Sequence, residues 1–253
     1  MANRYSEFSL SFSHFVNPKV QLGSEYKYQD ILSLEGFELA SKEITSWDNY
    51  KPTPLHSFDD IAQETGVSSV FYKDENTRFN LKSFKALGGA YAVANLLIKK
   101  LKDEGIKANS SDLILGTYKD YTSKLTVCCA TDGNHGRSVA WGAQQFGCNC
   151  EIYIHQKVSP GREKAIAKYG ALVNRIDGNY DESVRIAAKV AESNGYTVVS
   201  DTSYEGYTDI PKDVMQGYTV MVDEAMKQMN DTPTHVFLQG GVGGFPSAVV
   251  SFL

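Results

Sequence analysis

The sequence lacks long apolar runs. No stretch of its 253 residues approaches the run of about 18 apolar residues that a membrane helix requires. Residues 1–19 mix charged and polar side chains with scattered phenylalanines, so they lack the continuous apolar core of a signal peptide. We therefore expect a cytoplasmic protein that has no membrane partner.

An excess of charge of one sign is also missing. The 25 Lys and Arg residues stand against 30 Asp and Glu residues, which gives a formal net charge of −5. Nucleic-acid binding needs a concentrated basic face, whereas the densest basic cluster, residues 99–102, is followed at once by two acidic residues. We therefore expect no nucleic-acid partner. Hydrophobic residues at 42% are typical of a folded protein with one large domain or two modest ones.

Cysteine is scarce, and its spacing does not suit a metal site. The four cysteines are Cys128, Cys129, Cys148 and Cys150. Neither pair has the C-x2-C spacing of a structural zinc site. Adjacent and alternate cysteines within apolar stretches are better explained as small buried residues on strands. We therefore expect no metal.

What the sequence does contain is a β-α alternation that begins near residue 68. Strands are expected at residues 68–73, 125–130, 150–154, 171–176, 196–199 and 235–238. Helices are expected at residues 84–102, 135–146, 161–169, 182–193 and 212–229. This alternation implies parallel strand pairing with right-handed crossovers. A doubly wound sheet normally continues beyond a glycine-rich turn such as residues 239–244, so we expect the architecture to be unfinished.

Three motifs could carry chemistry, and the first is that turn. Four glycines around Val242, placed after an expected strand and before Pro246, would expose backbone N–H groups at the positive end of a helix dipole. Such a turn can hold a phosphate. The spacing fits neither the dinucleotide fingerprint nor a P-loop. A tight turn that needs a positive φ is an equally good explanation.

The second motif is a pair of lysines at the start of an apolar helix. A helix that begins near Ser83 would place Lys85 in its first turn, where the helix dipole and apolar neighbours disfavour a charged ammonium. That environment suits a lysine that forms a Schiff base. Lys82 competes for the role on the same grounds, and an ordinary surface lysine is the simpler alternative.

The third motif, residues 131–136, reads Thr-Asp-Gly-Asn-His-Gly and follows an expected strand. The carboxyl end of a strand is where open α/β sheets bind ligands. Backbone donors there could hold a carboxylate, and Asp132 could act as a general base. His135 by itself is more simply a capping or core residue.

In this order and separation, the three motifs resemble those of the fold-type II pyridoxal-phosphate enzymes, the tryptophan-synthase-β-like superfamily. Residues 83–85 match its Ser-x-Lys, which favours Lys85 over Lys82 as the cofactor lysine. Residues 133–135 match its asparagine loop, whose amide contacts the phenolic oxygen of the cofactor. Residues 240–244 match its phosphate loop.

The resemblance implies an α/β fold with two open, mostly parallel sheets flanked by helices. Residues 89–202 would form a small α/β domain, and residues 1–88 with 203–253 would form an incomplete large cofactor domain. The resemblance also implies pyridoxal 5'-phosphate (PLP) as cofactor, a small amino acid as substrate and a homodimeric assembly.

Within the superfamily the chain looks most similar to the diaminopropionate ammonia-lyases, which convert 2,3-diaminopropionate to pyruvate and two ammonia molecules. Asp132 stands where dehydratases carry a small residue, and residues 201–207 resemble the second acidic motif of these lyases. Residues 84–92 resemble their lysine helix. A serine/threonine dehydratase-like β-eliminating enzyme and an inactive truncated remnant remain alternatives.

The resemblance also assigns roles to single residues. Lys85 would hold the cofactor and act as a base, Asp132 would be a base on the opposite face, and Asp201 would be a second catalytic acid. The cofactor would be held by Asn134, Gly240, Gly241, Val242, Gly243 and Gly244. The substrate would be contacted by Thr131, Gly133 and His135.

Overall fold

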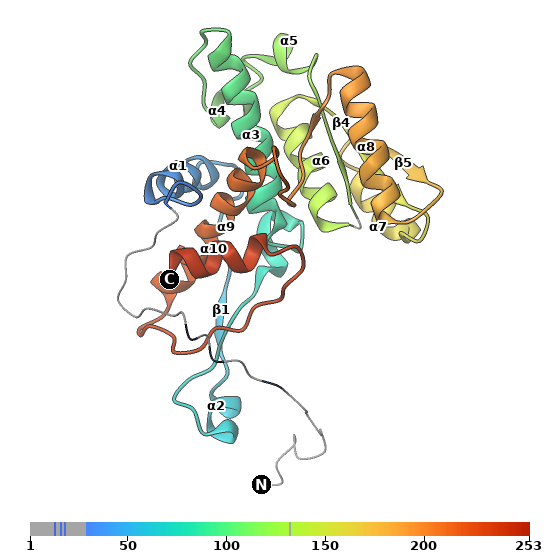
Figure 1. Cartoon of the computed structure of the whole chain (residues 1–253). Helices are drawn as coiled ribbons and strands as arrows, with labels where there is room; N and C mark the ends of the chain where they lie inside the picture. The colour runs from blue at the N-terminus through green and yellow to red at the C-terminus, as the bar shows by residue number, and fades with distance from the viewer. Residues whose placement is uncertain (1–12, 14–15, 17, 19–28, 132) are drawn as a thin grey trace.

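The computed structural model describes residues 13, 16, 18, 29–131 and 133–253 (Figure 1). The helices are α1 (Leu34–Thr45), α2 (Asp59–Thr65), the 3-10 helix η1 (Glu75–Asn80), α3 (Lys85–Asp103), α4 (Ser110–Ile114), α5 (Lys119–Thr122), α6 (Asn134–Phe146), α7 (Pro160–Ala167), α8 (Tyr180–Asn194), α9 (Asp209–Gln228) and α10 (Gly244–Phe252). The strands are β1 (Leu55–Ser57), β2 (Phe71–Lys73), β3 (Thr126–Ala130), β4 (Asn149–His155), β5 (Leu172–Ile176) and β6 (Thr197–Val198). Among the described helices, none is long and apolar enough to cross a membrane.

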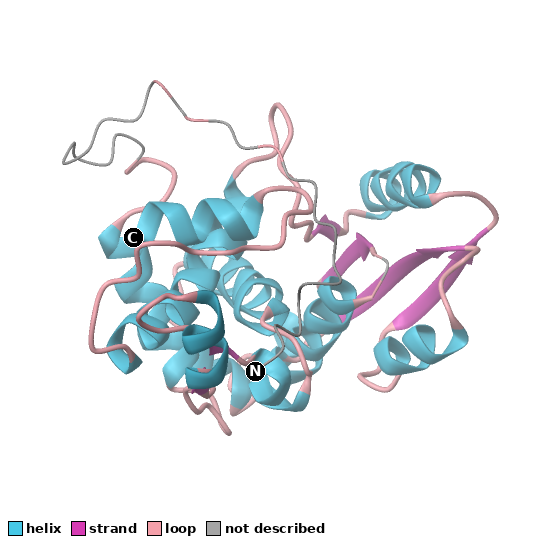
Figure 2. Ribbon diagram, turned by 90° about the horizontal axis from the view of Figure 1, so that it is seen from below, coloured by secondary structure: helices cyan, strands magenta, loops and turns pink. Residues whose placement is uncertain are grey.

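The main sheet has four parallel strands in the order β5-β4-β3-β6, with helices on both faces (Figure 2). Its side chains alternate between two apolar clusters. Cys128 and Tyr153 pack against Ala187 and Ala191 of α8, while Cys129 on the other face joins the main core. Cys128, Cys129 and Cys150 are buried, as predicted, and Cys148 is half-buried. The parallel β-α alternation predicted from the sequence is therefore confirmed.

The predicted strand at residues 235–238 is wrong. This segment has no regular secondary structure, and no described strand pairs with it. A strand is stabilised by backbone hydrogen bonds to a neighbour, so a local sequence preference alone does not produce one. The side chain of Phe237 is 94% exposed as a result.

Other element bounds differ from the predicted ones by a few residues. The strand predicted from residue 68 begins at Phe71, and it pairs antiparallel with β1 in a separate two-stranded sheet. The stretch between α3 and β3 contains the short helices α4 and α5. The main apolar core extends across both predicted domains, and the division at residues 88 and 202 stays a prediction.

Helix α3 lies between α6 and α9 and fixes the position of Lys85 at its first residue (Figure 1). Glycines allow the helix backbones to approach closely. A Cβ on Gly142 of α6 would lie 2.8 Å from the Cα of Ala90, and one on Gly217 of α9 would lie 2.0 Å from the carbonyl oxygen of Leu87. Any larger residue at these two positions would push the helices apart.

Candidate active site

The backbone of Lys85 is held by two serine hydroxyls. Ser83 Oγ accepts a hydrogen bond from the Lys85 N–H at 3.2 Å. Ser138 Oγ, from α6, donates to the Lys85 carbonyl oxygen at 2.7 Å and accepts from the Ala90 N–H at 3.0 Å. Ser138 is completely buried. The first turn of α3 is therefore fixed to α6.

The side chain of Lys85 faces a carboxylate that lies 116 residues further along the chain. Lys85 Nζ is 2.6 Å from Asp201 Oδ2, and these side chains are 22% and 15% exposed. The same ammonium lies 5.4 Å from the centroid of the Tyr218 ring. Lys82, the competing candidate, is exposed. Of the two lysines, Lys85 is the one that is largely buried and paired with a carboxylate.

Asp201 also faces His135. Its Oδ2 atom is 3.7 Å from His135 Nδ1, and His135 Nε2 is 2.8 Å from the carbonyl oxygen of Val199. A carbonyl oxygen only accepts, so Nε2 carries a proton. Burial raises the pKa of Asp201, but the electrostatic influence of His135 and Lys85 and the Lys85 hydrogen bond outweigh it and hold this pKa below its usual value. Asp201 is therefore an ionised carboxylate that faces both Lys85 and His135.

Two buried polar atoms at this site make no hydrogen bond within the described part of the chain: His135 Nδ1 and the hydroxyl of Tyr218. Tyr218 is 1% exposed. Burial and then the charge of Asp201 raise the pKa of this phenol far above its usual value, so it stays a donor. A buried group without a partner costs free energy, which makes this region a candidate for ligand contact.

The glycine turn lies close to this carboxylate. Gly243 has a φ of +91°, which favours glycine, and α10 begins at the next residue. An open cavity of about 370 Å³ is lined by Asp201, Gly243 and Gly244 together with Val242. The ring of Phe245 packs on Phe84, the neighbour of Lys85, with centroids 4.6 Å apart. The residues that follow the predicted phosphate loop and precede the predicted lysine are therefore in contact.

The turn fits a phosphate group. A Cβ placed on Gly240, Gly241 or Gly243 would meet no atom within 4 Å, so open space lies beside this backbone. The first N–H groups of α10 have no partner inside the helix and lie at the positive end of its dipole. Pro246 lies in the first turn of α10, as predicted. A second cavity of about 330 Å³ lies at the amino ends of β3, β4 and β5, and Asp201 does not line it.

The asparagine loop is held in shape from within. Thr131 Oγ1 accepts hydrogen bonds from the N–H groups of Gly133 and Gly136, both at 3.1 Å. Asn134 begins α6 and is exposed, and its Oδ1 accepts from Arg137 Nη2 at 3.0 Å. The same side chain carries two amide N–H donors, which can donate to an oxygen of a cofactor. Arg137 also donates to the carbonyl oxygen of Leu81, just before Lys85.

The other predicted residues are placed as follows. Thr131 is buried and its hydroxyl accepts from the loop backbone, and His135 is buried against Asp201. Their substrate contacts, and that of Gly133, stay predictions. Asp132 lies outside the described residues. The sequence interpretation missed Tyr218 and Arg137. For Arg137 a signal existed, since it lies three residues after Asn134 on one helix face.

Comparison with known proteins gives consistent matches. Residues 47–253 match the family described as "Pyridoxal-phosphate dependent enzyme". The diaminopropionate ammonia-lyase of Escherichia coli K12 is 45% identical over 81% of this chain and 51% of its own length. The Salmonella typhimurium diaminopropionate ammonia-lyase is 39% identical over 81% of this chain and 52% of its own length. The crystal structure of the E. coli enzyme in apo form matches with a TM-score of 0.81 at 42% identity, over 88% of this chain and 60% of that one. The chain thus spans about half the length of these curated relatives.

Proposed function

The chain belongs to the family of pyridoxal-phosphate dependent enzymes, and from this premise we propose that it is an ammonia-lyase for 2,3-diaminopropionate. The fold class and the cofactor predicted from the three motifs are confirmed by the family match and by the similar solved structures. The observation that carries the proposal is the contact of 2.6 Å between Lys85 Nζ and Asp201 Oδ2, because Asp201 also lines the cavity of the glycine turn. The relatives named diaminopropionate ammonia-lyase support the choice of substrate.

The residues of this site fit PLP. Lys85 would hold its aldehyde carbon, Asn134 would donate to its phenolic oxygen, and residues 240–244 would surround its phosphate. When bound, PLP makes the Cα–H of an attached amino acid acidic by drawing electrons into its ring. The protein then has to place proton acceptors near that Cα and a proton donor near the leaving group.

Asp201 prepares Lys85 for this role. An amine attacks an aldehyde only in its neutral form, so Lys85 must first give up a proton. Asp201 Oδ2 is within hydrogen-bond distance of Nζ and can accept that proton. His135 lies on the other side of the same oxygen and stabilises the negative charge of Asp201 while it is ionised. We propose that Asp201 and Lys85 exchange a proton in each cycle.

Asp132 supplies the second base in this proposal. Bases on the two faces of a planar cofactor can remove the Cα proton from either enantiomer of one substrate. A carboxylate also favours a substrate with a cationic β-ammonium group over serine, whose hydroxyl is neutral. The reaction consumes one water and gives one pyruvate and two ammonia molecules.

The first test uses the purified 253-residue chain. PLP is added, the adduct is reduced with borohydride, and the modified residue is located by peptide mass spectrometry. We expect modification at Lys85 and an unchanged adduct in Lys82→Ala, the matched control. Keto acid is then measured with 2,3-diaminopropionate, serine and threonine. Failure to trap PLP at Lys85 refutes the proposal, and a keto acid from serine or threonine alone makes the chain a dehydratase.

The second test addresses the two bases. Asp132→Ser is expected to abolish turnover of one enantiomer of 2,3-diaminopropionate and to leave most turnover of the other. The two enantiomers are assayed separately for pyruvate release. Equal loss with both enantiomers would contradict a division of work between two faces.

The proposal also covers the cellular location, the oligomeric state and the domain division of the protein. The family resemblance supports a homodimer in the cytoplasm and a small domain at residues 89–202. Sedimentation velocity of the chain would report its oligomeric state. Limited proteolysis would test the division, since cleavage is expected to concentrate near residues 88 and 202.

A further inference from the structure

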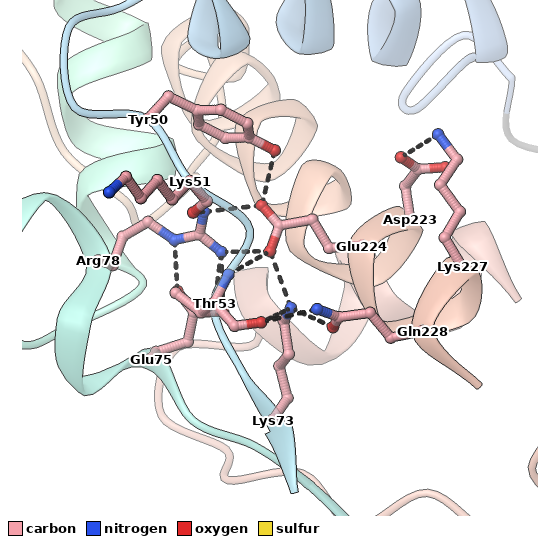
Figure 3. A network of polar contacts seen from close by, with 10 residues as sticks. All are labelled: Tyr50, Lys51, Thr53, Lys73, Glu75, Arg78, Asp223, Glu224, Lys227 and Gln228. Atoms are coloured by element: carbon pink, nitrogen blue, oxygen red, sulfur yellow. Dashed lines mark hydrogen bonds and ion pairs between the residues drawn. The ribbon is translucent and has the colours of Figure 1, made fainter.

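A buried charge cluster lies near the carboxyl end of α9 (Figure 3). We call it the Arg78 cluster and define it as Lys73, Glu75, Arg78 and Glu224. Arg78 is 1% exposed and Glu224 is 4% exposed. The guanidinium of Arg78 pairs with both oxygens of Glu224 at 2.7 Å and with both oxygens of Glu75 at 2.8 Å. Two cations and two anions make the cluster neutral.

The cluster joins segments that are distant in the sequence. Glu224 comes from α9, Glu75 and Arg78 come from η1, and Lys73 ends β2. Lys73 Nζ lies 2.8 Å from Glu224 Oε2 and donates to the carbonyl oxygen of Thr53 at 2.8 Å. Burial raises the pKa of Glu224, but Arg78 and Lys73 outweigh it and hold this pKa below its usual value. The paired charges therefore fix η1 to α9.

The backbone directly after Arg78 is strained. Phe79, Asn80 and Lys82 have φ values of +46°, +58° and +54°. Residues with a Cβ avoid this region because the Cβ crowds the following carbonyl oxygen. Such conformations persist only where the surrounding structure imposes them, and they concentrate at functional sites. Here they occupy three of the four positions that lead from Arg78 to Ser83.

The strained segment is held at both ends by the same helix. At its start, Arg78 is paired with Glu224 of α9. At its end, Tyr218 of α9 packs against Phe84 at 5.1 Å between centroids and lies beneath Lys85 Nζ. In the middle, the carbonyl oxygen of Leu81 accepts from Arg137 of α6. A change at the Arg78 end would be transmitted along a short, constrained path to Lys85.

We propose that Arg78 and Glu224 are positioning residues for Lys85. Their ion pair imposes the positive φ angles of Phe79, Asn80 and Lys82, and the resulting backbone path sets Lys85 Nζ against Asp201 Oδ2. This inference rests on the proposed function, in which Lys85 holds PLP. Neither Arg78 nor Glu224 contacts the cavity that Asp201 and the glycine turn share.

Two variants separate positioning from stability. Arg78→Lys keeps the charge but loses the planar fork that binds two carboxylates at once. The double variant Arg78→Met with Glu224→Met removes one cation and one anion, so the net charge of the cluster stays at zero. Replacing a buried ion pair by apolar residues of similar volume often preserves stability. Asp223→Asn, in the exposed Asp223–Lys227 pair of the same helix, is the matched control (Figure 3).

The readouts are the thermal midpoint, the rate at which PLP becomes borohydride-trappable at Lys85, and tryptophan fluorescence. The chain has two tryptophans, Trp47 and Trp141, and both rings pack against Phe79 at 5.8 and 5.0 Å between centroids. Their emission therefore reports the strained segment directly. We expect folded variants to show altered emission and PLP attachment slowed about tenfold or more. The control should match the wild type in all three.

The outcomes are distinct. If wild-type chain attaches no PLP at Lys85, the proposed function fails and the positioning role fails with it. If the wild type attaches PLP and a folded variant matches its rate and emission, the cluster serves stability alone and the inference is overturned. Should the double variant not fold, Arg78→Lys decides the question by the same two readouts.

Discussion

Two charged clusters meet α9, and they are built on opposite principles. In the Arg78 cluster, all three guanidinium nitrogens donate to oxygens, and both oxygens of Glu224 accept. Around Asp201, one carboxylate oxygen faces Lys85 and His135, while His135 Nδ1 and the Tyr218 hydroxyl lack hydrogen bonds within the described residues. A saturated cluster holds the fold together, whereas an unsaturated one keeps capacity for a ligand.

The largest effect on activity is expected at Asp201. Asp201→Asn keeps the size of the side chain but removes a proton acceptor, so we expect kcat/KM to fall about 10²- to 10⁴-fold. The free energy of unfolding should change by less than about 1 kcal/mol. Both are measured on the same preparation, with Asp213→Asn, which breaks the contact to Lys99 instead, as control. Unchanged turnover would show that Asp201 has a structural role and is not a proton acceptor in the reaction.

Glu224 should behave in the opposite way. Glu224→Ala leaves Arg78 and Lys73 buried without their shared partner, and we expect a loss of roughly 3–5 kcal/mol in the free energy of unfolding. Urea unfolding followed by circular dichroism measures it. Asp223→Ala, in an exposed ion pair one residue away, should cost less than about 1 kcal/mol. A similar small cost at Glu224 would show that the saturated cluster is not a stabilising element.

The carboxylates of both clusters should also affect how stability depends on pH. The pKa of Glu224 is lowered from 4.5 and that of Asp201 from 3.8. A carboxyl group with a depressed pKa contributes stability above its unfolded value, and that contribution is lost as pH falls through the folded value. Unfolding free energy should therefore decline below about pH 4.5 in the wild type. Glu224→Gln should decline less steeply over the same range, and an identical acid slope would contradict the assignment.

The smallest effect is expected at Tyr218. Its buried hydroxyl makes no hydrogen bond within the described residues, so Tyr218→Phe removes an uncompensated cost and should be neutral or stabilising by up to about 1 kcal/mol. If the hydroxyl serves the ligand cavity, the apparent affinity for PLP should fall at the same time. Thermal melts with and without PLP measure both. A clear destabilisation without PLP would mean that the hydroxyl is already satisfied.

Local patterns predict part of this molecule well. The helix that carries Lys85 and the parallel strands around Cys128 follow from periodicity, because their apolar residues repeat with the period of the element they form. The strand predicted at residues 235–238 fails for the converse reason. Its sequence favours a strand, but pairing depends on a neighbour that local sequence does not reveal.

The site residues likewise fall into those that the sequence predicts and those that it does not. Lys85 and the glycine turn are contiguous motifs, and the family resemblance places Asp201 with them. Tyr218 lies in the middle of an ordinary amphipathic helix, and nothing local connects it with a lysine 133 positions earlier. The contact between Arg78 and Glu224 spans 146 residues. Such long-range pairs follow from how helices pack, and local patterns in a single sequence do not predict them.

The close approach of α3 to its two neighbours has a consequence for native-state hydrogen exchange. The glycines at 142 and 217 let backbone press against backbone, and the side chains of residues 86–94 have almost no exposed surface. Amides in such a region exchange with solvent only when the whole core opens. The amides that follow Lys85 should thus be among the slowest to exchange. The side chain of Lys85 is therefore attached to the part of the chain that we expect to open last.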